Sequence, residues 1–183
     1  MIIIDFNAVA VSEGMTLCGY EKNITSHDIA GVALSRLGQL SAKFKREYGA
    51  TIVCCEGRGN WRKTVYPLYK KNRKVSKDKS RYDWDMMYDG FNLATDIINN
   101  DLQWLVMQVP MTEADDCIAV LARASQEKTL IVSRDSDFFQ LHNANIQQFD
   151  FVTKKMLKGD RGQHYFHEKY VRGSAKENIA NIS

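Results

Sequence analysis

The sequence has little proline and no long hydrophobic run. Only 2 of its 183 residues are proline, Pro67 and Pro110. No stretch approaches the roughly 20 consecutive apolar residues that a membrane helix needs, so we expect no membrane partner. The start, MIIIDF, has no basic segment and no small-residue cleavage site. We therefore expect no signal peptide and a cytoplasmic protein.

The cysteines are not spaced as in a redox centre or a zinc site. The 4 cysteines are Cys18, Cys54, Cys55 and Cys117. They contain no CxxC pair and no Cys/His spacing typical of zinc. Buried free thiols in a reducing compartment are the expected state. The sequence thus gives no support to a redox centre or a zinc site.

The apolar residues that are present predict an alternation of strands and helices. Runs typical of buried strands lie at residues 1–6, 50–57, 104–109 and 129–138, and helical spacing lies at 27–48, 83–100 and 113–126. Such a βα series predicts a mostly parallel sheet with helices on both faces, a three-layer αβα arrangement. Residues 146–158 predict a hairpin, followed by a turn at 159–162.

Acidic residues stand at the end of each of these four predicted strands. They are Asp5, Glu56, Glu113, Asp115, Asp116, Asp135 and Asp137. The carboxyl ends of parallel strands meet at one edge of a sheet, so we expect these side chains to converge there. Any one of them read alone is a common surface acid, and Glu113 at a helix start is stabilising in any case. The hypothesis of a site rests on their joint placement.

Converging carboxylates repel one another and need a counter-charge. Within these motifs the only basic residue is Arg134, whose side chain should point away from the acids on either side of it. Mg²⁺ and Mn²⁺ prefer oxygen ligands, and a pair of such ions can promote phosphodiester cleavage. The acids therefore predict a divalent-metal site.

The segment 58–82 is rich in Lys and Arg, has Asp78 as its only acid, and carries interleaved aromatic residues. Cations contact phosphates and aromatic rings stack on bases, so this segment is a candidate nucleic-acid interface. On one continuous helix, a single face would carry Arg62, Tyr66, Tyr69, Lys70 and Arg73. A solvated surface loop is the alternative interpretation.

Four stretches taken together resemble the 5′-nuclease superfamily, which includes flap endonucleases, the 5′-3′ exonuclease domain of bacterial polymerase I and phage 5′ nucleases. Within it, the likeness is to the ribonucleases H of T-even phages. The stretches are IIIDFNAVAVS (2–12), NWRKTVYPLYKKNR (60–73), TEADDCIAVLA (112–122) and LIVSRDSDFFQLH (130–142). The resemblance implies a PIN-like α/β catalytic domain at 1–172, with an inserted helical arch at about 57–90.

The resemblance also implies a role for each matching residue. Metal site one would comprise Asp5, Glu56, Glu113 and Asp115, with Asp116 near it, and site two Asp135, Asp137 and in part Glu177. Lys70 and Arg73 would contact the scissile phosphate, so the catalytic set would be Lys70, Arg73, Asp115 and Asp135. The nucleic-acid-binding set would be Arg62, Lys63, Tyr66, Tyr69, Lys70, Lys71, Arg73 and Lys74.

Three departures from the family pattern change these expectations. Glu56 stands where the family normally has Asp, and Ser174 replaces the first Asp of a motif that here reads GSAKEN. Serine carries no charge, so a second ion should bind more weakly, with Glu177 compensating in part. That motif normally opens a helix-turn-helix that grips duplex DNA and binds K⁺. We expect residues 173–183 to be the start of a truncated or absent segment of this kind, without K⁺.

The implied function is a divalent-metal-dependent 5′ nuclease, a 5′-3′ exonuclease or flap endonuclease that uses Mg²⁺ or Mn²⁺. Its partners would be DNA and RNA–DNA with 5′ flaps or single-stranded 5′ ends, as in primer removal, together with replication proteins such as a single-strand-binding protein. Two alternatives stay open. One is a PIN-type endoribonuclease, against which the long arch argues. The other is a weakly active accessory protein that binds nucleic acid, which Ser174 motivates.

Overall fold

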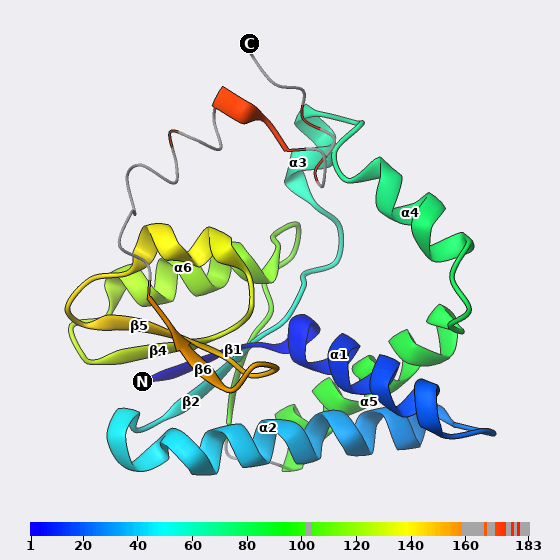
Figure 1. Ribbon diagram of the computed structural model, residues 1–183, viewed down its shortest axis with the longest axis horizontal. Helices are drawn as coiled ribbons and strands as arrows, with labels where there is room; N and C mark the ends of the chain where they lie inside the picture. The colour runs from blue at the N-terminus through cyan, green and yellow to red at the C-terminus, as the bar shows by residue number, and fades with distance from the viewer. Residues whose placement is uncertain (102–103, 159–166, 168–170, 175–176, 178, 180–183) are drawn as a thin grey trace.

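A single mixed sheet forms the centre of the molecule (Figure 1). The computed structural model describes residues 1–101, 104–158, 167, 171–174, 177 and 179. The strands are β1 (Ile2–Asp5), β2 (Thr51–Cys54), β3 (Leu105–Met107), β4 (Thr129–Val132), β5 (Ile146–Asp150) and β6 (Lys155–Leu157). Their order is β3-β2-β1-β4-β5-β6. All neighbours pair in parallel except the β5–β6 hairpin, so the predicted parallel sheet and the hairpin are confirmed.

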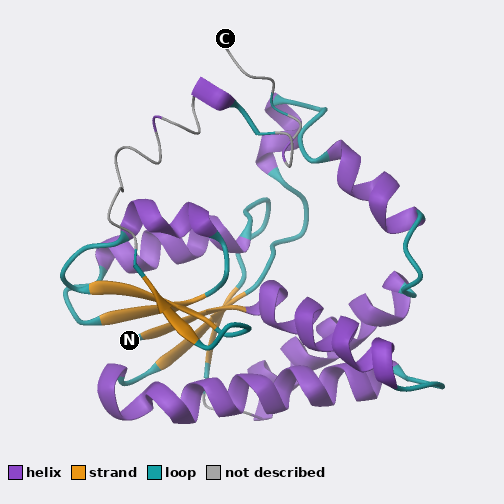
Figure 2. Ribbon diagram, in the orientation of Figure 1, coloured by secondary structure: helices purple, strands orange, loops and turns teal. Residues whose placement is uncertain are grey.

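Helices cover both faces of this sheet (Figure 2). On one face lie α1 (Phe6–Tyr20), α2 (Ser26–Tyr48) and α5 (Trp84–Asp101), packed on Ile2 and Ile4. On the other lie α6 (Ala114–Ala124) and the short 3₁₀ helix η1 (Ser136–Leu141), packed on Ile3. The alternation of strand side chains thus divides the core into two layers, as predicted. None of the helices in the described ranges is both long and apolar enough to cross a membrane.

One helix was not predicted, and two strands are shorter than expected. The helix α1 over 6–20 was not predicted because the apolar residues of FNAVAVSEGMTLCGY surround the helix and leave no periodic stripe. The second strand ends at Cys54 and the fourth at Val132, earlier than predicted. The fourth is cut short because the Asp135 side chain accepts from the backbone N–H of Asp137 at 3.0 Å and starts η1.

The packing of α2 against α5 requires a glycine at the crossing. A methyl group at Gly90 would lie 2.6 Å from Cβ of Ile29 and 2.7 Å from the carbonyl oxygen of Ser26. Both contacts are shorter than side chains tolerate, so the two helices approach closely only because this position has no side chain. In contrast, nothing lies within 4 Å of a methyl group added at Gly38 on α2.

We predict opposite effects for the two glycine-to-alanine changes. Alanine gains helix propensity at both positions, by up to about 1 kcal/mol. Gly38→Ala should therefore raise the free energy of unfolding, whereas Gly90→Ala should lower it by about 1–3 kcal/mol because of overpacking. Urea unfolding of the two variants measures both effects. Equal stabilisation by both would mean that α2 and α5 do not pack as described.

Candidate active site

The carboxyl edge of the sheet holds a buried and rigid carboxylate, Asp5. It ends β1 and is 7% exposed. Its Oδ2 accepts a hydrogen bond from Oγ of Ser133 at 2.8 Å, and its Oδ1 accepts from the backbone N–H of Ala8 at 3.1 Å. The second bond also caps α1. One residue therefore connects the strand, the following helix and the neighbouring strand end.

Asp115 lies close to Asp5 and Asp135 in this region. Burial raises the pKa of the Asp115 carboxyl to about 8, and the charges of Asp5 and Asp135 add to the increase, while Lys70 opposes it. The pKa of Glu56 is also raised, first by loss of hydration and then by the charge of Glu113. These mutual electrostatic effects connect five of the seven predicted acids, namely Asp5, Glu56, Glu113, Asp115 and Asp135. The site holds more negative charge than its surroundings neutralise.

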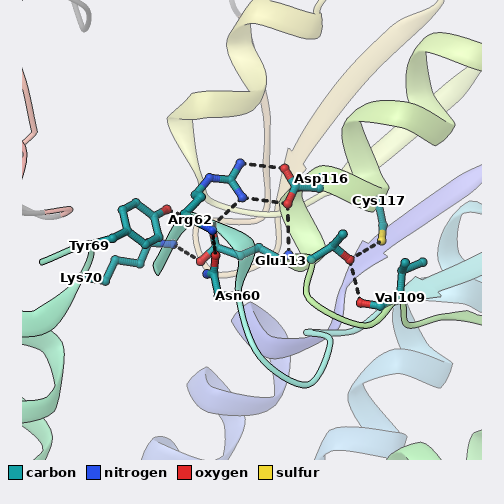
Figure 3. Close-up of polar contacts among 9 residues, drawn as sticks. Asn60, Arg62, Tyr69, Lys70, Val109, Glu113, Asp116 and Cys117 are labelled. Carbon is teal, nitrogen blue, oxygen red and sulfur yellow. Dashed lines mark hydrogen bonds and ion pairs between the residues drawn. The ribbon is translucent and has the colours of Figure 1, made fainter. Parts of the chain in front are cut away.

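Glu113 has a different environment, because two arch residues bind its carboxylate (Figure 3). It is 5% exposed. The hydroxyl of Tyr69 donates to its Oε2 at 2.9 Å, and Nζ of Lys70 donates to its Oε1 at 2.6 Å. Burial alone would raise the pKa of Glu113, but the hydrogen bond and charge of Lys70 outweigh burial and lower it. Glu113 is therefore held in its ionised form.

Asp116 is neutralised in a similar way by Arg62. The guanidinium donates from Nη1 to Oδ2 at 2.8 Å and from Nη2 to Oδ1 at 2.7 Å (Figure 3). Hydrogen bonding to Arg62 lowers the pKa of Asp116. The basic residues that neutralise Glu113 and Asp116 lie outside the acidic motifs, where no counter-charge was predicted. Arg62 and Lys70 come from a segment more than 40 residues earlier in the chain.

The acids fit a divalent cation by their chemistry. Among the described residues, no group of three or more His, Cys, Asp or Glu side chains is already arranged to hold a metal ion. Carboxylate oxygens are nevertheless the ligands that Mg²⁺ and Mn²⁺ prefer. Asp115 resists ionisation first because it is buried, and then because the charges of Asp5 and Asp135 outweigh that of Lys70. A cation beside Asp115 would remove that imbalance, so this donor set suits the predicted ion.

Two buried residues that position the acids were not predicted as part of the site. Ser133 and Gln148 are both 0% exposed. Oγ of Ser133 accepts from the backbone N–H of Asp135 at 3.1 Å, in addition to binding Asp5. Nε2 of Gln148 donates to the carbonyl oxygens of Ser133 and Asp135, at 2.9 and 2.8 Å. Ser133 stands in the S-x-D-x-D motif and could have been found, whereas Gln148 on β5 lies outside all the motifs.

A cavity of about 770 Å³ opens beside these acids. Its walls are the base of the arch, α6, η1 and the described residues between 173 and 179. Asp137, Ser174 and Glu177 all line it, together with Asp115. Two of the three members of the predicted second site, Asp137 and Glu177, thus line one cavity, whereas Asp135 is not among its lining residues. The structure also ties this end of the chain to the arch, since the backbone N–H of Lys70 donates to the carbonyl oxygen of Glu177 at 3.1 Å.

The arch is not the single helix considered from the sequence. It contains α3 (Trp61–Val65) and α4 (Lys71–Asp78), separated by a turn at Pro67 in which Lys70 adopts a positive φ of 53°. The predicted common face is therefore wrong: Arg62, Tyr69 and Lys70 point to the acids. The other predicted nucleic-acid residues are exposed, namely Lys63, Tyr66, Lys71 and Arg73. Lys74 belongs to α4, and its side chain lies outside the described part of the structure.

Backbone hydrogen bonds fasten the start of the arch to the loop before α6. The N–H of Gly57 donates to the carbonyl oxygen of Thr112 at 2.9 Å, and that of Trp61 donates to the carbonyl oxygen of Met111 at 2.8 Å. A methyl group at Gly57 would lie 1.9 Å from the carbonyl oxygen of Val109. Only glycine permits this approach, which sets where the arch begins.

The chain is similar in sequence to known proteins. The chain is 28% identical to Ribonuclease H of Enterobacteria phage T4 over 190 aligned residues, which cover 98% of this chain and 62% of that protein. It is 36% identical to the flap endonuclease Xni of Shewanella oneidensis over 105 residues, which cover 54% of this chain and 35% of that protein. The chain thus spans less than two thirds of the length of either relative.

Solved structures share the fold. A phage T5 5′-exonuclease with bound zinc superimposes on the whole chain with a TM-score of 0.80 and 16% sequence identity, and 70% of that protein is covered. A T5 protein co-crystallised with metal ions gives a TM-score of 0.78 at the same identity, with 69% of that protein covered. The family model of the 5′-3′ exonuclease N-terminal, resolvase-like domain matches residues 19–172. This match spans the sheet from β2 onward, the arch and the acids from Glu56 to Asp137, while Asp5 lies outside it, and the chain belongs to that family.

Proposed function

We propose that residues 1–172 form the catalytic domain of a divalent-metal-dependent 5′ nuclease, a 5′-3′ exonuclease or flap endonuclease. Its substrates would be DNA and RNA–DNA with 5′ flaps or single-stranded 5′ ends. The observation that carries the proposal is the position of Asp115. This carboxyl lies beside Asp5 and Asp135 and within the influence of Lys70, so a site for cations adjoins a residue of the basic arch.

Mg²⁺ or Mn²⁺ would be held by Asp5, Asp115 and Asp135, with Glu56 and Glu113 near them. When bound, such a cation promotes the ionisation of water and stabilises negative charge on phosphate oxygens. The protein contributes the fixed geometry of the acids. Ser133 holds Asp5 by a direct hydrogen bond and holds the backbone at Asp135 by another.

The arch would supply the contacts with the nucleic acid. Lys63, Lys71 and Arg73 are exposed and available to phosphates, and Tyr66 presents a ring for stacking on a base. Lys70 now donates to Glu113, and a substrate phosphate would compete for the same ammonium group. Movement of Lys70 from Glu113 to the phosphate would therefore bring positive charge to the phosphate and leave the negative charge of Glu113 available to the cation.

We propose that a second ion, if bound, is held weakly. Asp137 and Glu177 line the same cavity, but Ser174 there carries no charge. A site with fewer carboxylates binds Mg²⁺ less tightly. The same position motivates the second candidate function, that of an accessory protein that binds nucleic acid and cleaves it slowly.

We propose further that RNA primers and flaps of replication intermediates are among the substrates. Support comes from the names of two relatives, Ribonuclease H of phage T4 and flap endonuclease Xni. These relatives are longer than this chain, and that it shares their activities is part of what we propose.

A labelled 5′-flap substrate tests the function directly. With Mg²⁺ or Mn²⁺ we expect cleavage near the junction of flap and duplex, and none in the presence of EDTA. Asp135→Ala should abolish cleavage and retain substrate binding, whereas Asp89→Ala, an exposed acid on α5, should change neither.

Two other results would contradict the 5′-nuclease proposal, and a third would contradict the assignment of the acids. Tight binding without cleavage at any cation concentration would favour the accessory protein. Internal cleavage of single-stranded RNA without dependence on a 5′ end would favour a PIN-type endoribonuclease. Full activity of Asp135→Ala would show that the acids are assigned wrongly.

The raised pKa of Asp115 predicts how stability depends on pH when no divalent cation is present. Its ordinary pKa is 3.8 and its pKa in the folded protein is about 8. Between these two pKa values the folded state retains a proton on Asp115 that the unfolded chain has lost. The free energy of unfolding therefore falls as pH rises through this range. Asp115→Asn removes this loss. Its stability relative to the parent should rise from about pH 4 to pH 8, by at least about 1 kcal/mol, and then level off.

Urea unfolding in EDTA at several pH values measures this difference. Asp89→Ala serves as the control for removing one negative charge at an exposed position. A difference between Asp115→Asn and the parent that does not vary with pH would mean that Asp115 ionises as it does in water.

A further inference from the structure

Arg62 makes its polar contacts inside the protein, although it lies in the basic arch. Both ends of its guanidinium fork bind Asp116, and Nη1 also lies 3.5 Å from Oε2 of Glu113. The guanidinium carbon lies 4.7 Å from the centre of the Trp61 ring and 5.9 Å from that of Tyr69. The side chain is 27% exposed. Arg62 thus connects α3 with α6 and with the turn that carries Tyr69.

Asp116 has both carboxylate oxygens engaged in this arrangement. Oδ1 accepts from Arg62, and Oδ2 accepts from Arg62 and from the backbone N–H of Glu113, the latter at 3.1 Å. The bond to Glu113 closes a capping box at the start of α6. A bidentate arginine–carboxylate pair is one of the stronger and more directional polar contacts in proteins. A cation would have to compete with the positive charge of Arg62 to bind Asp116.

The pKa of the neighbouring Asp115 is shifted in the opposite direction to that of Asp116. Successive residues on a helix point about 100° apart, so these two carboxyls serve different sides of α6. One pKa is raised by burial and by other acids, whereas the other is lowered by Arg62. The two adjacent acids, which the sequence pattern treats alike, therefore occupy sites of opposite electrostatic character.

We infer that Arg62 is a positioning residue that fastens the base of the arch to α6, and that Asp116 is its anchor and not a ligand of the cation. The catalytic part of this inference rests on the proposed function. Fastened in this way, the short α3 directs the following turn back to the acids, where Tyr69 and Lys70 reach Glu113. Loss of the anchor should let Lys70 leave the site, while the ligands of the cation remain.

The first experiment measures the anchor without any cation or substrate. Arg62→Gln, Asp116→Asn and the double variant are compared with the parent by thermal unfolding in EDTA. Each single variant should lower Tm, and the double variant should lower it by no more than the larger single effect, because the pair is already broken. Additive losses would show that Arg62 and Asp116 act independently and would overturn the inference. This outcome does not depend on whether the protein is a nuclease.

The second experiment measures Mn²⁺ binding by calorimetry without substrate. The informative variant is Arg62→Gln/Asp116→Asn, because Asp116→Asn alone leaves an unpaired guanidinium beside Glu113. We expect its Mn²⁺ affinity to stay within about twofold of the parent, while Asp115→Asn loses at least about tenfold. A comparable loss in the double variant would identify Asp116 as a ligand and overturn the inference. If the parent does not bind Mn²⁺, this result contradicts the proposed function. The pairing of Arg62 with Asp116 is then tested by the thermal unfolding experiment alone.

The third experiment separates positioning from direct contact with nucleic acid. Lys63 is adjacent, exposed and of the same charge, so Lys63→Gln is the matched control. Loss of one phosphate contact reduces the dependence of log K on log salt by about one unit. For Arg62→Gln we expect a kcat at least about tenfold lower, an unchanged KM, and partial rescue of kcat by Arg62→Lys. A reduced salt dependence with an unchanged kcat would make Arg62 a phosphate contact instead.

Discussion

Electrostatic repulsion among carboxylates at one edge of the sheet is the constraint on which the rest of this structure depends. Burial raises the pKa of Asp115, and the nearby charges of Asp5 and Asp135 raise it further. The negative charges of two neighbouring acids, Asp116 and Glu113, are neutralised by basic side chains from a distant segment, Arg62 and Lys70. The folded chain therefore neutralises one part of the acidic edge internally and leaves another part in need of positive charge. We interpret the second part as the reactive one.

The topology explains how this division arises. Because β1, β2, β3 and β4 run parallel, their carboxyl ends bring the acids to one edge. The arch is inserted between β2 and α5, so its first helix must start at that same edge (Figure 1). Gly57 allows its first residues to pass close to the loop before α6. An insertion at this point can therefore deliver Arg62 and Lys70 to acids that follow it by more than 40 residues.

The sequence was sufficient for the features that depend on periodicity and on strand ends. It predicted the parallel sheet, the hairpin and the acids that follow each strand. It did not predict α1, whose apolar residues show no stripe, or the break in the arch at Pro67. Contacts between distant segments could not be predicted from the sequence either. The pairing of Arg62 with Asp116 and the support that Gln148 gives to the backbone at Asp135 depend on the tertiary fold, which no local pattern encodes.

The central claim is that the uncompensated carboxylates form the binding site for a divalent cation. Diffraction from a crystal soaked in Mn²⁺, with the anomalous signal recorded, locates such an ion directly. The account predicts a peak at coordination distance from carboxylate oxygens of Asp5, Asp115 and Asp135, with the Arg62–Asp116 pair intact. Anomalous density bound to Asp116, with Arg62 displaced and no peak beside Asp115, would contradict it.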